Sequence, residues 1–419
     1  MMKKTIALLL VVIMAFSLVA CGGGAATPDK PDDSAAPSDS SKPAPAEPTE
    51  PEEPAAEPSG EDVQPADTPS GDAPAATGDV GYYADALENA FNREKYEFVF
   101  IYNAATPLTL QEEACLQKFG EKLNFTLEGA TPSNDNDKYI TMIEEYAMDG
   151  VDGFVFDMDP AVQARGIEIL EEYDCKYVCL NNTMTGSTTS TSCVGPTVIC
   201  GSYDCGQIQM SWLVENYKNY WGDIDPSEIG YIGVTYSALN DINMRCVGAY
   251  DKFVELLPGN ADKAFYADCV SGGMNIDSAV SETTNAIVGN SSVKYWFIVT
   301  GSSDMGTGAA RAVESLGKDD CVLVTVIPAS PLIAEWETGY KGCWVAGVDF
   351  AYMYQASLVL SGLCALCDGR ATLDSLWADK RAEGDVRTKY QYDAPVLTID
   401  TYKEYYNDLY AGFGFDPIY

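Results

Sequence analysis

The sequence predicts an α/β fold with parallel sheets, arranged as two similar lobes. Short apolar runs alternate with longer segments in which apolar residues recur at helical spacing, a pattern typical of βαβ units. The alternation runs from residue 97 to residue 201 and restarts after residue 205, so it repeats in architecture although not in sequence. The roughly 340 residues that follow residue 82 are enough for two lobes with separate cores.

The predicted strands of the first lobe are short runs of aromatic and aliphatic residues. The first is EFVFIY at 97–102, and the spacing of Leu110, Leu116 and Leu123 predicts a helix after it. Short apolar runs and the helical spacing of apolar residues also predict the other strands and helices of this lobe. They are strands at 125–127, 154–156, 177–180 and 198–201, and helices at 140–147 and 162–170.

The second lobe follows the same pattern. The runs IGYIGV at 229–234 and YWFIV at 295–299 predict buried strands, and a long apolar segment at 350–366 predicts a helix. The remaining elements are strands at 264–267, 322–327 and 343–348, and helices at 205–220, 244–257, 276–288, 305–316 and 332–336.

One predicted strand ends in acidic residues. In GVDGFVFDMDP at 150–160, an apolar run is followed by Asp157, Asp159 and Pro160. A strand that is apolar on both sides suits a sheet covered on both faces, and such sheets bind ligands at the carboxyl ends of their strands. Asp157 and Asp159 are therefore candidate ligand residues, although either could merely cap the helix that starts at Pro160.

The first 81 residues are expected to lie outside the fold. Residues 1–20 have Lys3 and Lys4 followed by a short apolar run, as in a signal peptide. The motif Leu-Val-Ala-Cys ending at Cys21 resembles the lipobox of bacterial lipoproteins, which implies cleavage before Cys21 and a lipid on its sulfur. The alternative is an ordinary secretory signal with a chance cysteine. Residues 21–81 are acidic and proline-rich and predict a disordered tether. The expected location is the extracytoplasmic side of the cell membrane.

Composition excludes several functions. The chain has no histidine, which rules out histidine-based triads and histidine-ligated metals, and its net charge of −38 repels nucleic acid. No metal or other cofactor is expected. The twelve cysteines other than Cys21 could be disulfides or buried free thiols. The pair Cys364 and Cys367 resembles a redox or zinc motif, but it stands alone in an apolar helix, where small residues could simply pack.

Four segments together carry a family resemblance. They are FVFIYNAATPLTLQEEACLQKFGEKLNF, VDGFVFDMDPAV, NDINMRCVGAYDKF and SSDMGTGAARAVESLGK, in this order over about 300 residues. With APVLTIDTYKEY near the end of the chain, they resemble the periplasmic sugar-binding proteins of the ribose/galactose type (type I solute-binding proteins).

This resemblance implies two Rossmann-like lobes joined by a three-segment hinge, the periplasmic binding protein-like I fold. The crossings would fall near residues 202–204, 348–350 and 392–395. The implied N-terminal lobe comprises residues 96–202 plus 350–392, and the C-terminal lobe comprises residues 203–349 plus 393–419.

Carried over position by position, the resemblance implies a ligand site with part of the family's sugar chemistry replaced. The family's stacking aromatics fall on Leu108 and Thr109, and its Asp-Arg pair falls on Asn181 and Asn182. The aspartate expected after strand 322–327 is absent. The candidate ligand residues are Thr106, Leu108, Asp157, Asn181, Asn182, Arg245, Ser302, Asp304 and Asp349, with Val348 as the alternative to Asp349.

Several of these residues have simpler explanations. Asn181 and Asn182 could be turn residues, Arg245 a surface arginine, and Ser302 with Asp304 a helix cap. Because part of the family's sugar-binding chemistry is replaced, the ligand is expected to be either a different carbohydrate, stacked by other aromatics, or not a simple monosaccharide. The aromatics considered for stacking are Tyr102, Tyr203, Tyr236 and Trp344.

The function implied is a lipid-anchored substrate-binding protein that delivers a small polar solute, such as a sugar, to the permease of an ABC importer. The alternative is a binding lipoprotein that reports its ligand to a membrane receptor. An enzyme is not expected, because Asp157 and Asp159 are the only acid/base pair that the sequence offers.

Overall fold

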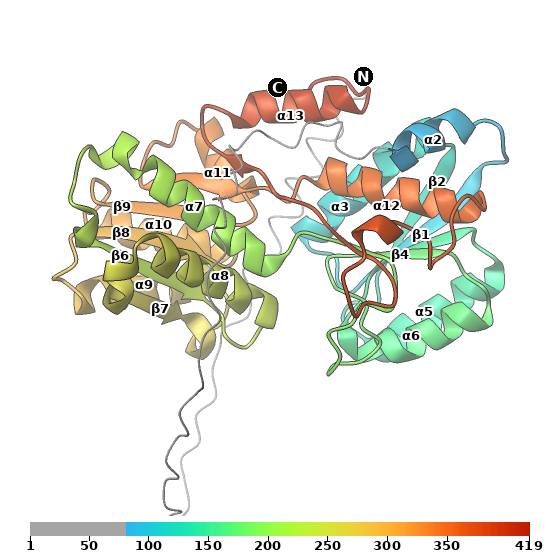
Figure 1. Ribbon diagram of the computed structural model, residues 1–419, viewed down its shortest axis with the longest axis horizontal. Coiled ribbons are helices and arrows are strands. Elements are labelled where there is room, and N and C mark those ends of the chain that lie inside the picture. Colours follow the sequence, from blue (N-terminus) through green and yellow to red (C-terminus); the bar gives the residue numbers. More distant parts are fainter. Residues whose placement is uncertain (1–80) are drawn as a thin grey trace, which may run out of the picture. The chain divides into compact units, whose positions relative to one another are not determined.

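The computed structural model describes residues 81–419, which form two α/β lobes (Figure 1). The predicted signal peptide at 1–20, Cys21 and the tether up to residue 80 lie outside the described residues. Residue 81, expected to end the tether, instead begins the helix α2 (Gly81–Asn89).

The first lobe contains a six-stranded parallel sheet in the order β11-β5-β4-β3-β1-β2. Five of its strands come from the first part of the chain and one returns from the last part. The strands are β1 (Tyr96–Tyr102), β2 (Phe125–Ala130), β3 (Gly153–Asp157), β4 (Tyr177–Leu180), β5 (Thr197–Ile199) and β11 (Lys389–Gln391).

Helices cover both faces of this sheet. They are α2, α3 (Pro107–Lys118), α4 (Gly120–Leu123), α5 (Asn136–Asp149), α6 (Pro160–Glu172) and α12 (Tyr352–Cys367). Along β1, Phe98 and Phe100 pack into the core that holds α3 and α12, whereas Val99 and Ile101 pack into the core that holds α5 and α6. Two buried faces explain why the predicted strands are apolar without alternation.

The second lobe contains another six-stranded sheet, in the order β12-β10-β9-β8-β6-β7. Its first five strands are parallel, and the short β12 pairs antiparallel with β10. The strands are β6 (Ile229–Thr235), β7 (Ala264–Asp268), β8 (Tyr295–Thr300), β9 (Val322–Val326), β10 (Trp344–Val348) and β12 (Val396–Leu397).

The helices of this lobe also cover both faces of their sheet. On one face, Leu213 of α7 and Phe253 of α8 pack with Tyr231 and Phe297; on the other, Ala279 of α9 and Val313 of α10 pack with Ile232. The helices are α7 (Ser202–Trp221), α8 (Asn240–Leu256), α9 (Ile276–Gly289), α10 (Ser303–Ser315), α11 (Ser330–Glu337) and α13 (Tyr402–Gly412).

Helix α12 is buried along its whole length up to Leu366. A helix that is apolar all round must be enclosed by protein or by lipid. Here α2, α3, α13 and strand β4 surround it. Within residues 81–419, no helix is long and apolar enough to cross a bilayer.

The chain passes between the two sheets three times, from β5 to α7, from β10 to α12, and from β11 to β12. The crossings are bonded to one another. The Tyr392 hydroxyl donates to the Phe350 carbonyl oxygen at 2.7 Å, and the Asp349 amide donates to the Pro395 carbonyl oxygen at 3.0 Å. The Gln391 side-chain amide also donates to the Asp204 carboxylate.

A small apolar cluster lies at these crossings, and we call it the hinge cluster. It contains residues from all three crossings and from the end of β9. Its buried members are Cys205, Ile327, Val348 and Ala394, and Cys200, Ile208, Phe350 and Val396 pack against them.

The last segment of the chain contacts helices of both lobes. The ring of Tyr402 lies 5.5 Å from that of Trp336 in α11, and the ring of Phe413 lies 5.5 Å from that of Phe119, which links α3 and α4. Lys122 also donates to the carbonyl oxygen of Gly414 at 2.7 Å. Residues 393–419, expected with the C-terminal lobe alone, therefore join the second sheet at β12 and then pack against the first lobe.

Helices α7 and α8 pack closely through glycines, and substitution of one of these glycines tests this packing. A methyl group on Gly248 would overlap the backbone oxygen of Tyr203. We expect Gly248→Ala to lower the free energy of unfolding by about 3 kcal/mol, because overpacking against backbone cannot be relieved by a rotamer change. Urea denaturation measures this loss. Gly259→Ala, where an added methyl meets nothing, is the control and should change stability by less than about 0.5 kcal/mol.

Candidate ligand-binding site

Two predicted residues meet at the carboxyl edge of the first sheet. Asp157 ends β3 and Asn182 follows β4, and the Asn182 amide donates to Asp157 Oδ1 at 2.5 Å. Because parallel neighbouring strands end at the same edge, their following residues are brought together. The sequence indicates Asp157 and Asn182 as separate candidates, and their contact is a finding of the structure.

A second polar network lies beside this pair. Gln355 Nε2 donates to Asn181 Oδ1 at 2.9 Å, and Asn181 Nδ2 donates to Glu112 Oε1 at 2.7 Å. Asn181 adopts a left-handed backbone conformation with φ of 62°, which asparagine tolerates better than most residues. The network joins helix α3, the end of β4 and the first turn of α12.

Glu112 and Asp157, the two buried acids of the site that belong to the first lobe, both have raised pKa values. Burial, helped by the charge of Asp157, raises the pKa of Glu112 to about 8. Burial raises the pKa of Asp157 to about 6, against the opposing effect of the bonds from Asn182 and Asn181. The charge of Asp241, in the first turn of α8, adds to the rise in the pKa of Asp157. An acid of the second lobe therefore lies within electrostatic reach of the first-lobe edge.

Arg245 is the main charged group of the site from the second lobe. It lies on α8, and its Nη1 donates at 2.7 Å to the carbonyl oxygen of Gly301, which follows β8. Its guanidinium lies 5.4 Å from the ring centre of Phe350, a crossing residue. Backbone and aromatic contacts thus hold Arg245 at the carboxyl edge of the second sheet.

Three buried side-chain atoms in this region have no hydrogen-bond partner. They are Glu112 Oε2, Tyr352 OH and Arg245 Nε. The charge of Glu112 raises the pKa of Tyr352 and that of Arg245 lowers it, after the larger rise caused by burial, so the three groups lie near one another. Buried polar atoms are nearly always paired in folded proteins. Ten other buried side-chain atoms within residues 81–419 also have no hydrogen-bond partner, so it is the grouping of these three near the carboxyl edges of the sheets that marks a candidate ligand site.

Other candidate residues have local structural roles. The Thr106 side chain caps α3, Leu108 packs against the core, and the Asp159 side chain caps α6. The Ser302 hydroxyl accepts from the Met305 amide at 3.5 Å at the start of α10, and Asp304 is exposed in the first turn. These placements leave their roles in ligand binding as predictions.

Asp349 lies at the second crossing. Its carboxylate is 2% exposed and accepts from the Tyr406 hydroxyl and the Ala351 amide, both at 2.9 Å. Burial raises the pKa of Asp349 to about 6, although both bonds oppose the rise. Asp349 already has two protein partners, unlike Glu112.

Of the aromatics suggested for stacking, Tyr102 and Trp344 are buried in the core. The Tyr203 hydroxyl donates to Asp251 at 2.7 Å. The rings of Phe350 and Tyr352 lie 5.8 Å apart, and the Phe350 ring also lies 5.4 Å from the Arg245 guanidinium.

Glu112, Tyr352 and Gln355 were not singled out from the sequence. Glu112 has one detectable signal, because it precedes Cys115, Leu116 and Phe119 by three, four and seven residues and so interrupts their buried stripe. Tyr352 and Gln355 have no such signal, because they open a helix whose every residue up to Leu366 is buried.

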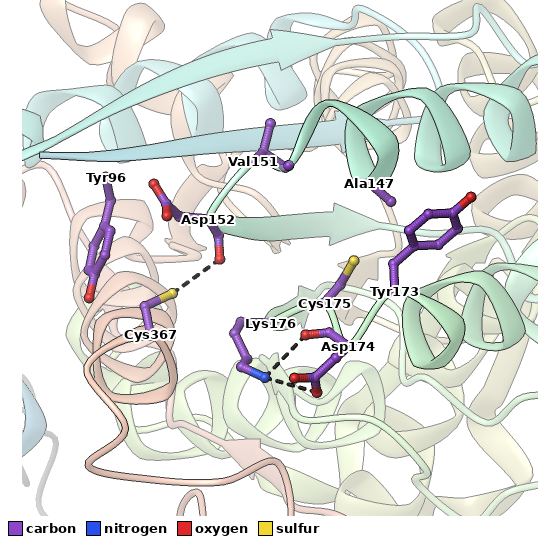
Figure 2. A pocket seen from close by; sticks show the side chains of 10 residues that line it. Tyr96, Ala147, Val151, Asp152, Tyr173, Asp174, Cys175, Lys176 and Cys367 are labelled. Atoms are coloured by element: carbon purple, nitrogen blue, oxygen red, sulfur yellow. Dashed lines mark hydrogen bonds and ion pairs between the residues drawn. The ribbon is translucent and has the colours of Figure 1, made fainter.

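A cavity of about 270 Å³ lies elsewhere, at the amino ends of the strands (Figure 2). Its polar groups already have partners. Lys176 donates to the backbone and side chain of Asp174, and the Cys367 thiol donates to the Asp152 carbonyl oxygen at 3.3 Å. All twelve cysteines within residues 81–419 are free thiols, including Cys364 and Cys367.

No family model and no curated protein matches this chain. Solved structures do match. A solute-binding protein of an ABC transporter from Actinobacillus succinogenes, with bound D-allose, is 14% identical with a TM-score of 0.54 over 74% of this chain and 100% of its own. A periplasmic ribose ABC transporter protein from Conexibacter woesei is 13% identical with a TM-score of 0.56, covering 74% and 93%. AraP, an arabinose binding protein from Geobacillus stearothermophilus, is 16% identical with a TM-score of 0.56, covering 74% and 99%.

At these identities, the likeness establishes the fold. The chain has the two-lobed fold of the periplasmic binding protein-like I class, as the sequence predicted.

The raised pKa of Glu112 predicts a pH dependence of stability. The folded state holds this proton more tightly than the unfolded state, so its contribution is complete below pH 4.5 and is lost as pH rises through about 8. Glu112→Gln mimics the protonated acid and keeps an oxygen for Asn181. We expect it to raise stability above about pH 8, by at most ~5 kcal/mol, and to flatten the fall in stability between these pH values.

Urea denaturation at several pH values checks this expectation. Glu121→Gln, at an exposed acid of α4, is the control and should leave the pH profile unchanged. A Glu112→Gln profile that falls as steeply as that of the parent protein would show that Glu112 ionises normally in the fold.

Proposed function

We propose that this chain is an extracytoplasmic solute-binding protein that holds a small polar solute, a carbohydrate, and delivers it to an ABC importer. The observation that carries the proposal is the group of three unpaired buried atoms, on Glu112, Tyr352 and Arg245. Each unpaired buried polar group costs about 1–3 kcal/mol until it finds a partner. A bound solute would provide those partners.

The chemistry of these atoms favours hydroxyl groups in the ligand. Arg245 Nε is a donor, the Tyr352 hydroxyl donates or accepts, and Glu112 is largely protonated at neutral pH because its pKa is about 8. A hydroxyl can both donate and accept, so a polyol can pair with all three. An anionic ligand is disfavoured because Asp157 and Asp241 lie at the same site.

The solved relatives support a carbohydrate. They are described as binding D-allose or arabinose, or as belonging to ribose transport. The site of this chain lacks the paired aromatics of the sugar-binding proteins at Leu108 and Thr109. Phe350 and Tyr352 offer the aromatic surface in their place, close to the unpaired atoms.

Anchoring by lipid on Cys21 is part of the proposal and is supported by the sequence alone. The motif before Cys21, with the acidic segment after it, suits a binding domain tethered to the outer side of a membrane. The permease of an ABC importer is the proposed protein partner. A sensing role, in which the loaded protein contacts a membrane receptor, is the alternative and would use the same site.

We also infer that the bound solute is not chemically changed. The sequence has no histidine, and Asp157 and Asp159 do not form a working pair, since Asp159 caps α6 while Asp157 is bonded to Asn182. The solved relatives are described as binding or transport proteins.

A ligand screen tests the proposal. We expect protein lacking residues 1–80 to gain thermal stability with one class of sugars or polyols. Ligand at about 100 times its dissociation constant adds about 2.7 kcal/mol, which is easily measured as a rise in Tm. Amino acids and nucleosides in the same panel are controls. Stabilisation by one of them alone, or by nothing in a broad panel, would contradict a carbohydrate-binding role.

Arg245 gives a second test. Once a sugar is identified, Arg245→Ala should weaken binding about tenfold or more, because a charge-assisted hydrogen bond is lost. Isothermal titration calorimetry measures the affinity, and circular dichroism checks the fold. Arg165→Ala, which removes an arginine paired with Glu168 on the exposed surface of α6, should leave affinity unchanged. Equal affinity of the Arg245 variant and the parent would remove Arg245 from the site.

A further inference from the structure

Two thiols face each other at the first crossing. Cys200 directly follows β5, and Cys205 lies in the first turn of α7. Their sulfur atoms are 3.0 Å apart, and no other two thiols in residues 81–419 are hydrogen-bonded to each other. Of the four residues between them, Gly201 lies in the crossing and residues 202–204 begin α7.

The pair lies inside the hinge cluster. Cys205 is buried there with Val348 and Ala394, which belong to the other two crossings. Cys200 is partly exposed as a whole residue, but its sulfur is largely buried, so reaction with a small reagent requires local opening of the crossing. A disulfide has a sulfur–sulfur bond of about 2.05 Å, so bonding needs an approach of roughly 1 Å.

The raised pKa of Cys200 is expected to make its oxidation slow at neutral pH, because little thiolate is present. The hydrogen bond with Cys205, followed by burial, raises the pKa of the Cys200 thiol well above its ordinary value, while nearby Arg245 lowers it slightly. Since the thiolate is the reactive form, oxidation is expected to be faster at alkaline pH.

We propose that Cys200 and Cys205 form an intramolecular disulfide when the protein meets a small-molecule disulfide such as oxidised glutathione. The Cys200 thiolate attacks one sulfur of the reagent and releases the first small thiol, which takes up the proton lost by Cys200. Cys205 then attacks the mixed disulfide and releases the second small thiol with its own proton. Two electrons pass from the two cysteines to the reagent, so the exchange balances without another oxidant.

The bond would close a ring around the first crossing. It would connect the end of β5 in the first sheet covalently to the first turn of α7 in the second lobe, across residues 201–204. Because this segment must change its backbone angles if the lobes move, the disulfide restrains hinge motion. The inference does not depend on the identity of the solute.

Peptide mapping tests the proposal. The purified full-length protein is incubated with oxidised glutathione at mildly alkaline pH, denatured, alkylated and digested with chymotrypsin, which cleaves after Tyr203 between the two cysteines. We expect the loss of two alkylatable thiols and a linked peptide pair containing Cys200 and Cys205, lighter by two hydrogen atoms. We also expect slower amide hydrogen exchange in residues 201–204 of the oxidised protein.

Cysteine variants make the assignment specific. Cys200→Ser and Cys205→Ser should each abolish the linked peptide, whereas Cys321→Ser, at a partly exposed thiol far along the chain, should retain it. The proposal is overturned if the thiols of the parent protein are not consumed, if Cys200 stops at a glutathione adduct, or if the linkage maps to other cysteines. Unchanged hydrogen exchange after oxidation would refute the restraint on the hinge.

Discussion

The three crossings between the sheets are the constraint on which the rest of the structure depends. Each sheet is completed by a strand that arrives through a crossing, β11 in the first lobe and β12 in the second. The crossings share hydrogen bonds, from Tyr392 to Phe350 and from Asp349 to Pro395, and pack through the hinge cluster. Residues distant in sequence, such as Glu112 and Tyr352, can therefore form one site.

Asp349 shows how closely the crossings are tied to the end of the chain. A buried carboxylate is stable only with donors nearby, and the Tyr406 hydroxyl of α13 is one of its two. The other is the amide of Ala351, whose φ of 50° is unfavourable for a residue with a side chain. The surrounding contacts must offset this strain. Helix α13 thus helps to fix the second crossing as well as packing on both lobes.

The sequence predicts the fold well because its strands are buried on both faces and so have a simple signal. It also gives Asp157 and Asn182 as separate candidate ligand residues at the carboxyl ends of strands, and the contact between them is seen only in the structure. It does not predict Tyr352, because a buried polar residue at the start of an apolar helix is indistinguishable from core until its neighbours are known. Helix α2 is not predicted, because its only buried apolar residues are Tyr83 and Ala86, with Ala90 just after its end. This pattern is too weak to recognise directly after the long acidic segment.

The acids of the site suit the proposed binding of a neutral solute by a chain with a net charge of −38. Burial raises the pKa of Glu112 to about 8, so near neutral pH Glu112 is mainly protonated and can donate a hydrogen bond. Burial raises the pKa of Asp157 only to about 6, so Asp157 keeps most of its charge and accepts a hydrogen bond from Asn182. A neutral donor loses little solvation when it pairs with a hydroxyl, whereas a buried charge loses a great deal. A neutral Glu112 therefore suits the proposed polyol better than an ion, without the aromatic pair that is missing at Leu108 and Thr109.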